Sequence, residues 1–313
     1  MRRADSKGLP AALLAYGLWG FFPLYFNFLG RSNPFEIVAH RIWWTFAFCV
    51  VGVTLIGAWG KVAQAFRNPK LIGILLVAGL LVSLNWLVYI FAVLTDHVVD
   101  GALGYFINPL ITVGLAVIFL KEKVRPAQVA ALGIGLVAVI VLVIGVGHLP
   151  WIGLILALTF GFYSLVKSKV GHQVTPFIGL GIETLALAPV SIGFIIFLEV
   201  TRHGTLTTVS WPYSLLLIGT GLVTGIPLLL FAVGAARLSL ISLAFIQYIA
   251  PIGQFLVGVV VFHEEMPTVR WIGFVLIWLA LVVLSWDMVQ RARTIKNTKT
   301  DTTKTDSTET APH

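Results

Sequence analysis

Long apolar runs separated by short polar stretches dominate the chain. Crossing a hydrocarbon core about 30 Å thick takes a helix of about 20 apolar residues. The runs have this length and are apolar on all faces, without two-residue alternation, which favours helices over a membrane barrel. The pattern therefore predicts an all-α integral membrane protein with ten transmembrane helices, at 9–29, 35–57, 71–94, 99–119, 127–146, 151–167, 176–198, 213–235, 240–262 and 269–287.

The second half of the chain repeats features of the first at an offset of 142 residues. Pro34-Phe35 returns as Pro176-Phe177, and the Tyr105–Pro109 segment returns as Gln247–Pro251. Each unit contains five spans, an odd number, so the second unit must insert upside down. Inverted repeats recur in secondary transporters, with the substrate site near the midplane between them. The predicted organisation is an N-terminus at 1–8, five-helix repeats at 9–146 and 150–288, and a disordered, Thr-rich tail at 289–313.

Charge settles the predicted orientation. Only 11% of residues are charged and 58% are hydrophobic, which excludes an ordinary soluble enzyme. With the N-terminus inside, 17 of the 21 Lys and Arg residues lie on the cytoplasmic side and four outside. Short cytoplasmic loops carry this excess in membrane proteins, so both termini are expected in the cytoplasm. The net charge of +8 is then a topology signal, and no nucleic-acid partner is expected.

Several short motifs lie within the predicted spans: Glu36-Ile-Val-Ala-His40-Arg41 with Trp44, Asn85-Trp86, Gly104-Tyr-Phe-Ile-Asn-Pro109, Phe162-Tyr163 with Lys167, Glu183-Thr184 with Pro189, and Gln247-Tyr-Ile-Ala-Pro251. These motifs carry a resemblance to a known family. The chain resembles the drug/metabolite transporter superfamily, EamA-type transporters, and within it the RarD (chloramphenicol-sensitive protein) family. The resemblance implies two five-helix repeats in a bacterial inner membrane and export of a small metabolite or amphipathic compound. The chain departs from the family pattern at Ala250 and at His263-Glu264.

Ionisable residues inside spans are costly and are therefore functional candidates. Arg41 is a candidate cavity-lining cation that attracts an anionic group, or else it snorkels to the outer headgroups. Glu183 is a candidate proton carrier, or else it makes a buried structural hydrogen bond. His40 is a candidate too, or a packing residue, with Glu36 one turn away. Arg41 and Glu183 are repeat equivalents, but an axial gap of roughly 11 Å argues against a direct salt bridge.

Polar and aromatic residues in the middle of the spans extend the candidate site. A mid-helix proline removes a backbone hydrogen bond, so paired prolines in the two repeats predict hinges or cavity walls, or simply packing kinks. Tryptophans at this depth could stack on an amphipathic substrate or fill space. The substrate candidates are Asn85, Trp86, Tyr105, Asn108, Gln247 and Tyr248, and the hinge candidates are Pro109 and Pro251.

A transporter is favoured over an intramembrane enzyme acting on a lipid-linked substrate and over a channel. The chain has no paired carboxylates, no phosphate-binding loop and one cysteine, Cys49, so no catalytic residue, metal or cofactor is predicted. The expected partners are a small molecule and the lipid bilayer. Gly221 and Gly225 have the spacing that lets helix backbones approach, for which a homodimer is one use.

Overall fold

The computed structural model describes residues 7–146, 151–263, 268–269, 271–276, 278–280 and 282–283. Over these ranges the chain is helical and contains no strand. Eight helices are long and apolar enough to cross a membrane, or nine if one bent pair is counted as a span. Seven of the 19 residues of the tenth predicted span, 269–287, lie outside the described residues, as does the whole predicted tail, 289–313.

Asparagines and prolines mark where helices of the first half begin. The Asn33 side chain accepts the backbone N–H of Glu36 at 2.9 Å, and Asn68 accepts that of Leu71 at 3.2 Å. A proline follows each asparagine, at a position whose N–H has no helical partner in any case. The helices of this half are α1 (Gly8–Gly20), α2 (Phe22–Asn27), α3 (Pro34–Leu55), α4 (Trp59–Phe66), α5 (Pro69–Leu94), α6 (Val98–Leu120) and α7 (Pro126–Val146).

Helices of the second half are interrupted more often. α9 and α10 meet at a bend of 56° and together form one candidate span. A further span consists of α12, α13 and a π-helical turn. The helices are α8 (Trp151–Val170), α9 (Pro176–Leu185), α10 (Ala188–Val200), α11 (Trp211–Arg237), α12 (Leu240–Ile246), α13 (Ile249–Leu256) and η1 (Val257–Val261).

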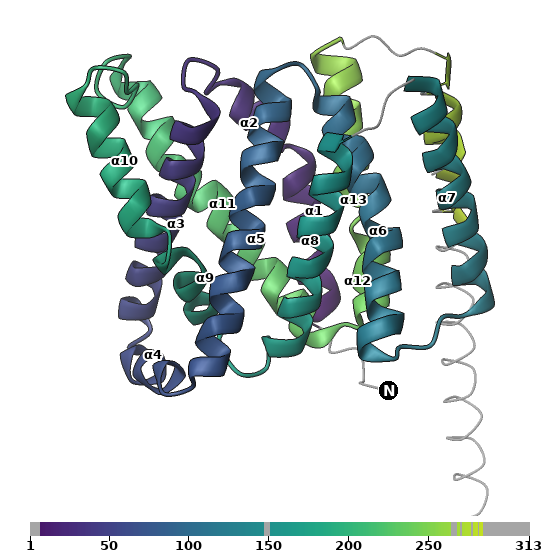
Figure 1. Cartoon of the computed structure of the whole chain (residues 1–313), viewed down its shortest axis with the longest axis horizontal. Coiled ribbons are helices and arrows are strands. Elements are labelled where there is room, and N and C mark those ends of the chain that lie inside the picture. The colour runs from purple at the N-terminus through teal and green to yellow at the C-terminus, as the bar shows by residue number, and fades with distance from the viewer. Residues whose placement is uncertain are drawn as a thin grey trace, which may run out of the picture.

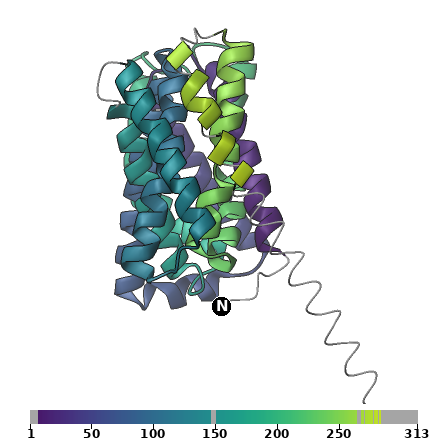
Figure 2. The same ribbon diagram turned by 90° about the vertical axis from the view of Figure 1, so that its right-hand side faces the viewer.

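Helices of each half pack against helices of the other half in a reciprocal pattern. α1 packs against α11 and α13, and α8 packs against α5 and α6. α3 contacts α11, while α5 contacts α9. In Figure 1, α3 descends from the top of the bundle whereas α9 and α10 climb towards it, and α5 and α11 also run in opposite directions. Figure 2 shows the same helices from the side, still aligned along one direction.

Glycine pairs allow close approach at two of these crossings. A Cβ on Gly20 of α1 would lie 3.2 Å from the Cα of Gly253 in α13. A Cβ on Gly104 of α6 would lie 2.5 Å from the Cα of Gly153 in α8. Both crossings therefore bring backbone against backbone with no side chain between them.

The Gly221-x-x-x-Gly225 spacing is used inside the molecule. A Cβ on Gly221 would lie 2.5 Å from the carbonyl carbon of Trp44, and one on Gly225 would lie 2.6 Å from the Phe48 ring. These glycines thus let α11 approach α3. A homodimer remains a prediction, and this glycine pair does not support it, because its contacts lie within the chain.

The two hinge candidates lie in different surroundings. Pro109 is inside the continuous helix α6, whereas Pro251 follows the break between α12 and α13 at Gln247 and Tyr248. Pro251 has no N–H for the carbonyl of Gln247, which instead accepts the N–H of Ala250 at 3.2 Å. The helix is therefore interrupted in only one of the two equivalent positions.

Candidate functional site

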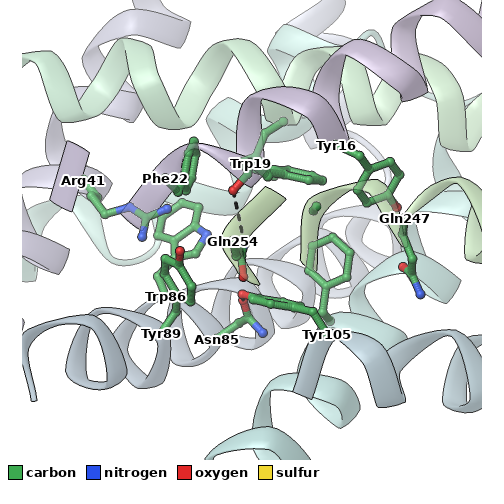
Figure 3. Close-up of a pocket in the computed structure, with 13 residues that line it drawn as sticks. Tyr16, Trp19, Phe22, Arg41, Asn85, Trp86, Tyr89, Tyr105, Gln247 and Gln254 are labelled. Atoms are coloured by element: carbon green, nitrogen blue, oxygen red, sulfur yellow. Dashed lines mark hydrogen bonds between the residues drawn. The ribbon is translucent and has the colours of Figure 1, made fainter. Parts of the chain in front are cut away.

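A central cavity opens between helices of both halves of the chain (Figure 3). It contains about 530 Å³ of atom-free space, part of it open to solvent. Its wall is mostly aromatic and apolar with a few polar groups, which is the usual composition of a small-molecule site. The lining residues are Tyr16, Trp19, Phe22, Arg41, Asn85, Trp86, Tyr89, Tyr105, Phe160, Leu228, Gln247, Ala250 and Gln254.

Arg41 supplies the cationic group of this cavity. Its side chain is 2% exposed, and its guanidinium carbon lies 4.6 Å from the ring centroids of both Phe26 and Trp86. Its Nε–H donates to the hydroxyl of Thr224 at 3.1 Å, while Nη1 has no hydrogen-bond partner among the described residues. Burial to this extent contradicts the alternative that Arg41 snorkels to the headgroups.

No carboxylate of the described residues forms an ion pair with Arg41. Two aromatic faces offset part of the cost of burying the cation, at about 0.5–2 kcal/mol each. An unpaired buried charge is nevertheless strongly unfavourable, because attraction to a counter-charge is what compensates desolvation. The arrangement is therefore suited to an anionic group that enters from the cavity.

Three further buried polar atoms of the wall have no partner in the part of the chain that the structure describes: the hydroxyl oxygens of Tyr16 and Tyr89, and Oε1 of Gln254. Gln254 is fixed by its amide nitrogen, which donates to the carbonyl of Trp19 at 3.1 Å (dashed in Figure 3). A buried polar group without a partner costs about 1–3 kcal/mol. These orphaned groups gather on the wall of one cavity, which is typical of a site that a ligand or water completes.

Asn85 belongs to the wall but its hydrogen bonds are used within the protein. Its amide nitrogen donates to the carbonyl of Leu156 at 3.1 Å and to the hydroxyl of Thr159 at 3.0 Å. Its oxygen accepts the hydroxyl of Tyr105 at 3.0 Å. Asn85 therefore fastens α5 to α8 and orients the Tyr105 ring at the cavity.

Asn108 and Gln247 form a second polar link, between α6 and the break after α12. The Gln247 amide donates to the Asn108 oxygen at 2.8 Å, and the Asn108 amide donates to the carbonyl of Ala157 at 2.7 Å. Of this link only Gln247 reaches the cavity wall. Tyr248, another sequence candidate, packs beside Phe106 and does not line the cavity.

Glu183 lies outside the cavity, in an ion pair that the sequence does not indicate. Its Oε1 is 2.6 Å from Nζ of Lys167, and its Oε2 accepts the hydroxyl of Tyr163 at 3.0 Å. Both members of the pair are buried. Lys167 is thus a buried residue and the partner of Glu183, whose carboxylate makes the kind of buried structural contact named as the alternative to a proton carrier.

His40 and Glu36 have separate partners. Nδ1 of His40 accepts the indole N–H of Trp44 at 3.2 Å, and its Nε2 has no partner. Oε1 of Glu36 accepts the backbone N–H of Thr205 at 2.6 Å and its hydroxyl at 3.0 Å. His40 is not part of the cavity wall, and the Glu36 carboxylate holds the loop before α11.

Sequence reasoning missed part of the wall: Tyr16, Trp19, Phe22 and Gln254. Gln254 carried a usable signal, because it is a polar side chain within an apolar run and lies three residues after Pro251. The aromatic residues carried no such signal in a chain with 38 aromatic side chains, given 10 Trp, 7 Tyr and 21 Phe. Across the described ranges, no group of three His, Cys, Asp or Glu residues is placed to hold a metal ion.

Comparison with known proteins gives consistent results. The model of the EamA-like transporter family matches residues 6–144 and again residues 150–286. Protein RarD of Streptomyces exfoliatus is 43% identical over 291 residues, covering 92% of this chain and 91% of that protein. Protein RarD of Escherichia coli K12 is 36% identical over 291 residues, covering 93% and 98%. A protein of Vibrio cholerae described as an uncharacterized transporter is 38% identical over 282 residues, covering 90% and 93%.

A solved crystal structure has a similar fold. It superposes with a TM-score of 0.66 at 21% sequence identity, covering 90% of this chain and 98% of the other. The Vibrio cholerae protein and two further relatives, from Bacillus subtilis and Pseudomonas aeruginosa, are described as uncharacterized transporters.

Proposed function

The chain belongs to the EamA-like transporter family, and from this premise we propose that it is a secondary transporter that exports a small metabolite or drug-like compound by alternating access. The observation that carries the proposal is the central cavity, whose wall contains an unpaired buried cation, Arg41, and orphaned polar groups. A ligand that pairs with these groups would bind in the middle of the bundle, where the two states of a transport cycle would give access from either end of the bundle. Transporters with inverted repeats place their substrate site there.

We further propose that the molecule has ten transmembrane helices in two inverted five-helix repeats, at 9–146 and 150–288. The reciprocal packing of α1 and α8 supports this arrangement, since each first helix contacts the third and fourth spans of the other half. The opposite directions of α3 and the α9–α10 pair support it too (Figure 1). The cavity then lies between the repeats.

The proposed location is the bacterial cytoplasmic membrane, with both termini in the cytoplasm. Cysteine accessibility tests the orientation in a Cys49→Ser background, with Arg31→Cys and Lys61→Cys introduced separately, because both native side chains are exposed. An impermeant maleimide should label position 31 on intact cells and position 61 only after permeabilisation. The reverse pattern would contradict the proposed orientation.

Transport is tested with purified protein in proteoliposomes and a panel of small metabolites, with and without a proton gradient. Saturable flux that depends on the protein supports the proposal. Conversion of a compound without its translocation would support an enzyme instead, and non-saturable flux would support a channel.

The buried pair of Lys167 and Glu183 is the proposed coupling site. A carboxylate beside an ammonium group at this depth can exchange a proton if the pair separates during the transport cycle. Glu183→Gln should then abolish the response of flux to a proton gradient, while the affinity of the cavity for the substrate stays unchanged. If flux retains its full response in this variant, Glu183 has no coupling role.

A further inference from the structure

We infer that the cavity binds small organic carboxylates with a flat apolar body, and that the guanidinium of Arg41 holds the carboxylate group. The inference rests on the proposed function only in naming this ligand as the transported substrate. Binding itself follows from the charge, the hydrogen-bonding groups and the shape of the wall.

The charge of the wall is the first step. Among the described residues that line it, Arg41 is the only Lys, Arg, Asp or Glu, so the wall carries an unbalanced positive charge. The two glutamates buried elsewhere in the described spans are engaged with other groups, since Oε1 of Glu36 accepts from Thr205 and Glu183 pairs with Lys167, and neither is paired with Arg41. A ligand carboxylate would supply the missing counter-charge, in surroundings where attraction between charges is much stronger than in water.

Hydrogen-bonding capacity points the same way. In the cavity wall, four buried groups have no partner among the described residues: Nη1 of Arg41, the hydroxyls of Tyr16 and Tyr89, and one acceptor, Oε1 of Gln254. Three of these four can donate, which suits a carboxylate because it only accepts. The wall has no carboxylate to receive an ammonium group, so a cationic amine or an amino-acid zwitterion would leave its charge unpaired.

The shape of the wall selects the rest of the ligand. Rings of Trp19, Phe22, Trp86, Tyr105 and Phe160 line the cavity. In Figure 3, Arg41 lies at one end and Gln247 at the other, with aromatic rings between them. Flat apolar bodies pack well against such rings, in edge-to-face or offset-stacked contacts.

Isothermal titration calorimetry of the purified full chain in detergent tests the inference by measuring the affinity for each probe. The probes are benzoate, 3-phenylpropionate and indole-3-acetate, each compared with its neutral primary amide. At least one carboxylate should bind tenfold or more tightly than its amide, since a charged hydrogen-bonding pair is worth about one to two decades in affinity. Phenylalanine and 3-phenylpropylamine should bind more weakly than 3-phenylpropionate.

Two variants locate the effect. Arg41→Gln should remove the preference for acid over amide, whereas Arg31→Gln, which removes an exposed charge away from the cavity, should keep it. The acid–amide comparison on the unmodified protein needs no variant, so it stands even if Arg41→Gln fails to fold.

Equal binding of acids and amides, binding of none of the acids, or tighter binding of the amines overturns the inference. The proteoliposome assay separates this failure from failure of the proposed function. Saturable flux of neutral or cationic compounds would leave a transporter that does not select carboxylates. Selective carboxylate binding without any flux would support the inferred ligand class and refute the proposed transport.

Discussion

The buried ion pair between α8 and α9 allows a quantitative prediction. Lys167 and Glu183 are 2.6 Å apart and both are buried. Removing one member of such a pair leaves the other charged and uncompensated, which typically costs about 3–5 kcal/mol. Lys167→Met should therefore destabilise the protein by about this amount, and Glu183→Gln should have a similar effect.

The double variant Lys167→Met/Glu183→Gln removes both charges at once. Because replacing a whole buried pair by uncharged groups is often close to neutral, it should lie within about 1–2 kcal/mol of the unmodified protein. Thermal unfolding of all four proteins in detergent, followed by circular dichroism, measures the cycle. Lys169→Met is the matched control, since Lys169 lies on the same helix and is exposed. If the two single effects simply add in the double variant, the charges do not stabilise each other and the reasoning is refuted.

Three further predictions use the same unfolding assay. Gly79→Ala should cost about 1–3 kcal/mol or more, because its Cβ would lie 2.0 Å from the backbone oxygen of Glu183. Gly73→Ala on the same helix, with open space around it, should cost almost nothing, and equal effects would contradict the assigned contact. Glu122→Ala should lower the free energy of unfolding by about 0.5–2 kcal/mol, because the Glu122 carboxylate accepts the backbone N–H groups of Leu240 and Ile241 at 2.9 and 3.2 Å. It should also speed hydrogen exchange at these two amides. Lys123→Ala is the control there, and unchanged exchange in Glu122→Ala would refute the cap. Thr205→Val should cost about 1–3 kcal/mol, because its hydroxyl contacts Ser32 at 2.5 Å and Glu36 at 3.0 Å. Thr201→Val, whose hydroxyl bonds only its own helix, should cost less, and the opposite order would count against this cluster.

The apolar pattern predicted where most spans lie but not where they break. Burial in lipid requires only enough apolar length, so the sequence signal is the same for a straight helix and a bent one. The three breaks each precede a proline by a few residues: Pro23, Pro189 and Pro251. Proline alone was no sufficient signal, because Pro109 and Pro227 lie inside continuous helices.

The candidate site was predicted in part. Arg41 and Trp86 could be recognised because a charge and a large ring deep in a span are unusual and conspicuous. The partner of Glu183 could not, since Lys167 stands at the end of an apolar run and looks like a loop charge. It is buried only in the tertiary structure, where its ammonium group lies beside Glu183 of α9. Burial of an ionisable group is thus decided by tertiary contacts that the local pattern does not contain.

The glycine crossings have a consequence for how the helices could move. Side chains that interlock must change rotamer before two helices can turn relative to each other, because packed interiors leave no free volume. At Gly20–Gly253 and at Gly104–Gly153 no side chain stands between the backbones. Gly20 is the last residue of α1 and Gly153 the third residue of α8, so a rotation about these two contacts would move the opposite ends of the two helices furthest.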